Sequence, residues 1–127
     1  TILGASTFSQ DASFTGDVSV DGFLNIGTDT ELTLSANTSG VVAATQTSHN
    51  VDTYADASTG DLITISGGTE GDILILRANN AARTVVLKDG GGNLRLAGDF
   101  SMDHNQDQIT LNYNGTNWIE LARSSNA

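Results

Sequence analysis

The sequence predicts an all-β protein, and three observations carry that prediction. Between Asp61 and Arg123, short segments rich in Val, Ile and Leu alternate with clusters of Gly, Asn and Asp, which is typical of strands joined by tight turns. No helix of useful length fits the apolar pattern of this region. The chain also contains no proline, which is consistent with paired strands. We therefore expect a small antiparallel β-sandwich or barrel.

Six strands are expected in this region, separated by turn clusters such as Gly67-Gly68 and Asn79-Asn80. They cover residues 62–66, 73–78, 84–88, 94–97, 109–113 and 118–122. Upstream of them, residues 41–42 and 51–54 are candidates for edge strands. Six or more short strands are enough for one modest core.

The last two expected strands are joined by Asn114-Gly115, a strong hairpin signal. A two-residue loop would put the apolar residues of the two strands on opposite faces, whereas an odd loop gathers them on one face. We therefore expect a three-residue or bulged connection with Gly115 in a left-handed conformation. In that register Trp118 lies on the face away from Leu111.

Residues 1–40 contain few large apolar side chains and form a separate segment. Most of these side chains come in pairs two positions apart, which marks strands of only three or four residues. The pairs are Val18/Val20, Leu24/Ile26 and Leu32/Leu34. Such short strands cannot exclude water alone, so we expect several chains to wind together and bury the pairs on a shared axis. We place the boundary with the second domain, residues 41–127, near Gly40.

Two parts of the chain resemble proteins of tailed bacteriophages. Residues 6–35, STFSQDASFTGDVSVDGFLNIGTDTELTLS, resemble the FTGxVxVxGxLxIxG type of repeat in tail-fibre and spike proteins. Residues 67–77, 87–96 and 118–124 are similar to the GGxEGDxLxLR, VKDGxGNLxL and WxELxRS phrases of the head module attached to such repeats. The resemblance implies a parallel homotrimer, with an intertwined β shaft over residues 1–40 and a β-rich head over residues 41–127.

The function implied by this resemblance is attachment of a virion to the surface of its bacterial host. The chain would be part of an external fibre or spike, with a host glycan or protein as receptor and other virion proteins bound through a region further upstream. Two alternatives stay open. One is a capsid-decoration protein, or head fibre, without receptor binding, and the other is a glycan-cleaving spike.

The charge of the chain limits the kinds of molecule that it can bind. The net charge is −10, and ten of the 15 acidic residues but none of the five basic residues precede Arg77. Such a surface repels phosphate backbones, so we expect no nucleic-acid partner. No apolar run approaches membrane-spanning length, so we expect no membrane insertion. There is no cysteine, which excludes disulfides and thiolate metal sites.

Residues 103–107, DHNQD, space oxygen ligands as the start of a calcium loop does. However, Gln108 and Asn114 stand where that loop needs a glycine and a bidentate acid. We interpret the stretch as a polar hairpin tip and expect no metal.

His49 and His104 lie in unlike contexts, and no nucleophile motif is present. We therefore expect neither an enzyme nor a cofactor.

Aromatic and polar residues around the last two turns are the candidates for a receptor contact, because sugars stack on aromatic rings and bond to polar groups. The candidates are Tyr113, Asn117, Trp118, Asp103, His104 and Asp107. For Trp118, burial between protomers is the favoured alternative to sugar contact, because subunit interfaces are rich in such rings.

Overall fold

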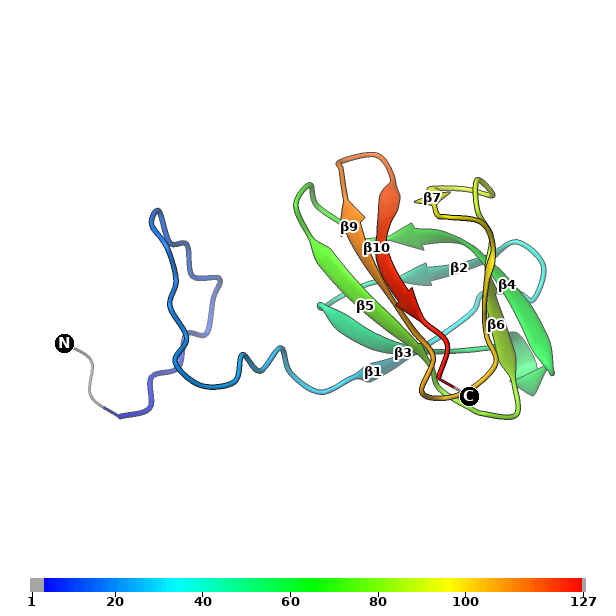
Figure 1. The fold of residues 1–127 in the computed structure, drawn as a ribbon, viewed down its shortest axis with the longest axis horizontal. Coiled ribbons are helices and arrows are strands. Elements are labelled where there is room, and N and C mark those ends of the chain that lie inside the picture. The colour runs from blue at the N-terminus through cyan, green and yellow to red at the C-terminus, as the bar shows by residue number, and fades with distance from the viewer. Residues whose placement is uncertain (1–3, 127) are drawn as a thin grey trace.

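The computed structural model describes residues 4–126 and confirms the all-β class (Figure 1). Residues 30–126, which we call the body, form two packed sheets. Residues 4–29, the leading segment, extend away from the body and contain no strand. The helical structure of the described chain is limited to η1, the three residues Tyr54–Asp56.

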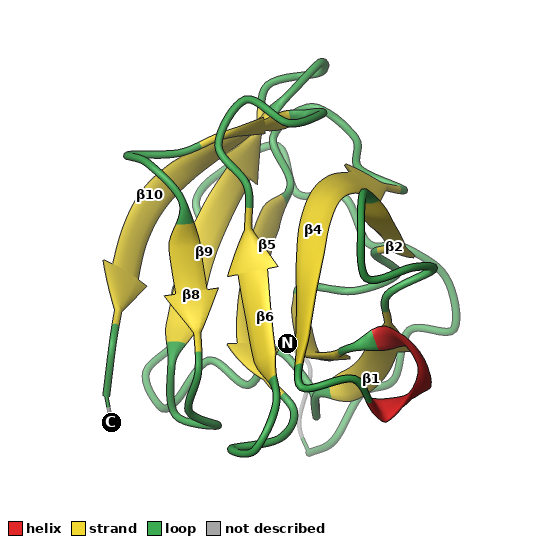
Figure 2. Cartoon of the chain, turned by 90° about the vertical axis from the view of Figure 1, so that its right-hand side faces the viewer, coloured by secondary structure: helices red, strands yellow, loops and turns green. Residues whose placement is uncertain are grey.

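Ten strands build the body (Figure 2). They are β1 (Thr30–Thr33), β2 (Gly40–Ala43), β3 (Ser48–Asp52), β4 (Thr59–Ser66), β5 (Ile73–Ala78), β6 (Thr84–Leu87), β7 (Leu94–Arg95), β8 (Phe100–Met102), β9 (Gln108–Tyr113) and β10 (Trp118–Ser124). Sheet A has the order β1-β3-β5-β9-β10-β7, and sheet B has the order β2-β4-β6-β8.

From β1 to β8 the chain alternates between the two sheets, so its path resembles a solenoid. The pairs β1–β3, β3–β5, β2–β4 and β4–β6 are parallel, because each turn of the coil returns to the same sheet in the same direction. The coil ends where β8 and β9 run antiparallel to β6 and β5. The expected antiparallel head is therefore wrong for five of the eight strand pairings.

All six strands expected in the second half are present. β5 has the expected bounds, and the other ends differ by at most three residues. The two edge-strand candidates also form strands, as β2 and β3, although β3 lies inside sheet A. β8 was not expected. Val18/Val20 and Leu24/Ile26 lie in the leading segment, outside any strand of the described single chain.

The body begins ahead of the boundary expected near Gly40. β1 pairs with β3 along its whole length. Leu34, which follows β1, is only 1% exposed, and its N–H donates to the carbonyl of Asp52 at 2.9 Å. Residues 30–40 therefore belong to the compact body, and the leading segment stands apart from it except at its end, where Asp29 pairs with Arg77 at 2.7 Å.

The β9–β10 hairpin differs from the expected one. Its loop has four residues, 114–117, and Gly115 has the expected positive φ, of 90°. The bulge lies inside β10, at Leu121, rather than in the turn. Trp118 consequently lies on the same face as Leu111, and both are buried. The predicted orientation of Trp118 is wrong because the irregularity falls after Trp118 and not before it.

The core lies between the two sheets and is built from the inward-facing residue of every second strand position. Its fully buried members include Val51, Leu76 and Leu111 from sheet A, and Leu62 and Leu87 from sheet B. Parallel strands that carry buried side chains on one face keep their register, because a one-residue slip would expose them.

Truncating a core leucine should destabilise the body strongly. We expect Leu76→Ala to lower the free energy of unfolding by about 2–5 kcal/mol, because Leu76 is 0% exposed and a cavity would remain. Ser101→Ala is the control. Ser101 lies at an exposed position of β8, so the loss should stay within about 0.5 kcal/mol. Urea unfolding followed by circular dichroism gives both values, and equal losses would contradict the assigned core.

Candidate functional site

The residues expected to contact a receptor lie at two places rather than one. Tyr113, Asn117 and Trp118 border the β9–β10 turn, whereas Asp103, His104 and Asp107 border the β8–β9 turn. The six residues of β9 separate the two groups. A strand of that length spans roughly 20 Å, so these side chains do not form a single site.

Trp118 is buried inside the body, where it is 1% exposed. Its indole N–H donates to the carbonyl of Ile65 at 3.1 Å. The ring of Tyr113 lies against it, with centroids 4.9 Å apart. Gly68 leaves room for the indole, since a Cβ at that position would be 2.6 Å from Trp118 Cζ2. Trp118 thus packs within its own chain, and it is available neither for a sugar nor for the interface between protomers that we favoured.

Asp107 is also buried, at 0% exposure, and it fixes the C-terminal end of the chain. Its Oδ2 accepts the backbone N–H groups of Asp103 and His104 at 3.0 and 3.1 Å, and its Oδ1 accepts that of Asn126 at 2.6 Å. Burial by itself would raise the pKa of Asp107, but these donated hydrogen bonds outweigh it and the pKa lies below its usual value. Asp107 is therefore a structural anchor rather than a surface contact.

His49 is fully buried and also has a structural role. Its Nε2 accepts the backbone N–H groups of Thr45 and Gln46 at 3.0 and 3.3 Å. The other ring nitrogen, Nδ1, then carries the proton and donates to the carbonyl of Thr30 at 3.0 Å. No group of three His, Cys, Asp or Glu side chains among residues 4–126 is arranged to hold a metal ion.

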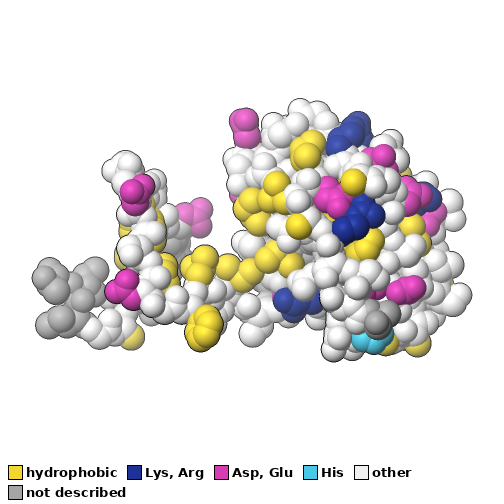
Figure 3. Space-filling model, in the orientation of Figure 1, with side chains coloured by type: hydrophobic (Ala, Val, Ile, Leu, Met, Phe, Trp, Pro, Cys, Tyr) yellow, Lys and Arg dark blue, Asp and Glu magenta, His cyan; other side chains and the backbone are white. Residues whose placement is uncertain are grey.

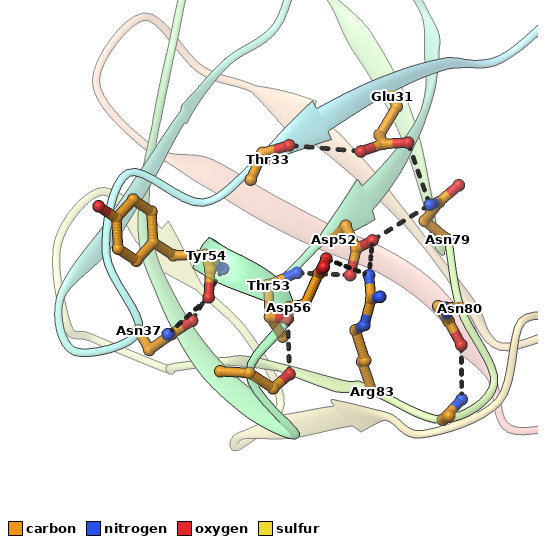
Figure 4. Close-up of polar contacts among 12 residues, drawn as sticks. Glu31, Thr33, Asn37, Asp52, Thr53, Tyr54, Asp56, Asn79, Asn80 and Arg83 are labelled. Atoms are coloured by element: carbon orange, nitrogen blue, oxygen red, sulfur yellow. Dashed lines mark hydrogen bonds and ion pairs between the residues drawn. The ribbon is translucent and has the colours of Figure 1, made fainter.

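A network of polar side chains gathers where β3 ends (Figure 4). The carboxylate of Asp52 accepts the N–H of Thr53 at 2.8 Å and pairs with Arg83 at 2.6 Å. Arg83 also pairs with Asp56 at 2.9 Å, and Asn79 donates to Asp52 at 3.3 Å. Asp52 is 5% exposed, so these partners compensate for the desolvation of its charge.

Beside this network, Asn37 holds the backbone of Tyr54 from both sides. Tyr54 N–H donates to Asn37 Oδ1 at 2.8 Å, and Asn37 Nδ2 donates to the Tyr54 carbonyl at 2.9 Å. The Tyr54 ring points away from the Asp52–Arg83 pair in Figure 4 and is half exposed, at 51%. The two connected loops thus present an aromatic side chain on a fixed backbone.

These two loops also contain the strained backbone of the molecule. Within residues 4–126, the non-glycine residues with positive φ are Ser39 (58°), Ala55 (51°) and Asp56 (58°). A left-handed conformation costs an L-residue about 1–2 kcal/mol, and such strain tends to persist at functional sites. We call residues 35–40 and 53–57 the Tyr54 platform. It is a candidate binding surface that the sequence did not reveal, because alanine gives no signal for positive φ.

The Tyr54 platform has the groups of a recognition surface. It presents one aromatic face together with hydroxyl, amide and carboxylate groups, which suits contact with polar ligands. Of the receptor-contact residues predicted from sequence, Asp103 is exposed, and Tyr113, Asn117 and His104 are partly exposed, at places away from this platform.

Replacing the anchor carboxylate should weaken the body and change its response to acid. We expect Asp107→Asn to cost about 1.5–3 kcal/mol of unfolding free energy, because hydrogen bonds to a charged acceptor are lost. Since the folded-state pKa is lowered, the stabilisation is present above the unfolded value of about 3.9 and disappears as the pH falls through the folded value. The wild type should thus lose more stability below pH ~4 than Asp107→Asn.

Urea unfolding between neutral and acid pH measures this difference. Glu70→Gln is the control, since Glu70 lies in an exposed turn and should leave the profile unchanged. Parallel pH profiles for wild type and Asp107→Asn would contradict the assignment.

Relieving the strain in the Tyr54 platform should stabilise the protein. Ala55 has φ 51°, which glycine adopts freely. The larger entropy of glycine in the unfolded chain offsets part of the gained stability. Ala55→Gly should therefore raise the free energy of unfolding by up to ~1 kcal/mol. Ala57→Gly, at φ −63°, should instead destabilise by about 0.4–1 kcal/mol. Thermal unfolding measures the stability of both variants. A loss of stability in both would argue against strain at Ala55.

Comparison with known proteins adds no relative. No protein-family model matches the chain, and no curated protein matches it. A search of residues 4–126 for a helix long and apolar enough to cross a membrane finds none. A function must therefore be argued from the residues and their arrangement.

Proposed function

We propose that this chain is a component of a virion fibre or spike that attaches to a host bacterial surface as a homotrimer. The observation that carries the proposal is the exposure of the leading segment. Its large apolar side chains are exposed by 40–102% in the single chain: Phe8, Phe14, Val18, Val20, Phe23, Leu24 and Ile26. Figure 3 shows hydrophobic side chains along this segment. Exposed apolar surface on this scale marks an interaction site.

Association of copies through the leading segment is energetically reasonable. Full burial of a large apolar side chain contributes about 1.5–3 kcal/mol, so the seven together can contribute on the order of 10 kcal/mol per chain. That is comparable to the ~4–15 kcal/mol that association costs in lost freedom of motion. Three chains wound on one axis give each apolar pair two neighbouring copies to pack against.

Attachment follows from the arrangement that this trimer would have. The three bodies would display three equal copies of each loop, and weak contacts made together gain affinity by avidity. The Tyr54 platform contributes a half-exposed aromatic ring to that surface. The similarity of residues 6–35 and 67–77 to phage fibre phrases supports a virion location.

The trimer can be tested with variants of the leading segment. We expect native mass spectrometry to show three copies for the wild type, and Phe23→Ser/Leu24→Ser to shift the protein to a single copy while the circular dichroism of the body persists. Asp21→Asn is the control in the same segment and should remain trimeric. A single copy for the wild type at micromolar concentration would contradict the proposal.

Attachment is tested separately with whole cells. Fluorescently labelled wild-type trimer should bind cells of the host bacterium and block adsorption of the virus. A stable trimer that binds no member of a broad panel of bacteria would instead favour the decoration role. Release of reducing sugar from purified cell-surface polysaccharide would favour the glycan-cleaving alternative.

A further inference from the structure

The outer face of sheet A carries apolar side chains that are exposed or half-buried in the described chain. The strand registers place Ile73, Asn112 and Ile119 in one row across β5, β9 and β10. The next row contains Ile75, Thr110 and Ala122. We call Ile73, Ile75, Ile119, Leu121 and Ala122 the sheet A patch.

The exposed side chains of the patch stand out within the body. Ile73 is 41% and Leu121 is 59% exposed, and besides Tyr54 they are the large hydrophobic residues of the described body with exposure on this scale. Hydrophobic side chains are visible at the surface over the start of β5 (Figure 3). β5, β9 and β10 are interior strands of sheet A, so the patch lies on the middle of a sheet and not on a frayed edge.

The patch is also free of negative charge, although the chain carries 15 acidic residues. Neither of the two rows across β5, β9 and β10 contains an Asp or a Glu. Arg95 extends the first row, since it pairs with Ile119. A second copy with the same net charge of −10 can approach this face without repulsion between carboxylates.

Arg95 adds an attractive element at the rim of the patch. Four basic side chains form ion pairs: Arg77 with Asp29, Arg83 with Asp52, Lys88 with Asp99, and Arg123 with Glu120. Arg95 is the basic residue among residues 4–126 without such a pair, and its guanidinium donates only to the carbonyls of Gly92 and Leu94. An acidic partner therefore finds an uncompensated cation beside an apolar surface.

We infer that the sheet A patch is the surface through which the bodies of neighbouring copies contact one another. The occupant is a second copy of this chain, whose acidic surface complements Arg95. The patch is small, since specific interfaces use roughly 20–30 residues on each side. It therefore extends the contact made by the leading segment, which continues directly into β1 of the same sheet. This inference rests on the homotrimer proposed above.

The absence of cysteine allows a direct test on the full chain. Leu121→Cys introduces a thiol in the patch, and Ser101→Cys introduces one at an exposed position of β8 in sheet B. Both thiols would be accessible in the single chain. In the assembled protein we expect alkylation of Leu121→Cys by N-ethylmaleimide to be slower than that of Ser101→Cys, on the order of tenfold.

The native mass of the same samples shows whether the patch contact alone fails or the homotrimer fails as well. A trimer in which both cysteines react equally fast overturns the patch contact and leaves the homotrimer standing. A single copy in every sample overturns both proposals. As a second variant, Ile119→Asp should weaken the trimer, seen as dissociation at higher protein concentration, whereas Ser101→Asp should not. A trimer equally stable with either aspartate would also overturn the inference.

Discussion

The rest of the body depends on one interaction, the packing of the two sheets against each other. This packing buries the apolar face of each strand. A strand that alternates apolar and polar residues gains stability only when a second sheet covers its apolar face. Here the chain achieves this by passing from one sheet to the other at almost every connection. From β3 to β6 each new strand lies parallel to the strand two places earlier, and the core grows one turn at a time. The antiparallel β8 and β9 end that growth at one side of the body.

The connections of this coil are held by buried polar groups rather than by apolar packing. His49, Asp52 and Asp107 are each at most 5% exposed, and each accepts or donates hydrogen bonds to loop backbone. No buried side-chain nitrogen or oxygen within residues 4–126 lacks a partner. Because loops tied in this way lose little further freedom on binding, they suit recognition by preformed surfaces. The Tyr54 platform is the clearest case, since Asn37 holds the backbone of Tyr54 and Arg83 pairs with the strained Asp56.

The single chain leaves two apolar surfaces without cover, and they have different origins. The leading segment has too few large side chains to form a core, so each apolar pair lies in solvent. The sheet A patch lies on a well-formed sheet whose opposite face is already buried. The proposed trimer would account for both by one cause, since copies joined along the leading segment would bring their bodies close together. Two bodies that met at the carboxylate-free patch would avoid the repulsion that the acidic first part of the chain creates elsewhere.

The sequence by itself determined the all-β class, the position of the six later strands and the positive φ of Gly115, because these depend on local alternation and turn chemistry. Only the tertiary structure decided that the strands pair mostly in parallel, since apolar alternation is the same for either direction. It also decided the burial of Trp118 and Asp107. The four-residue loop before Trp118 places the indole on the core face, and the backbone of Asn126, far along the chain, closes over the carboxylate. Tertiary contact likewise created the Tyr54 platform, because Asn37 and Tyr54 meet only when the coil brings their loops together.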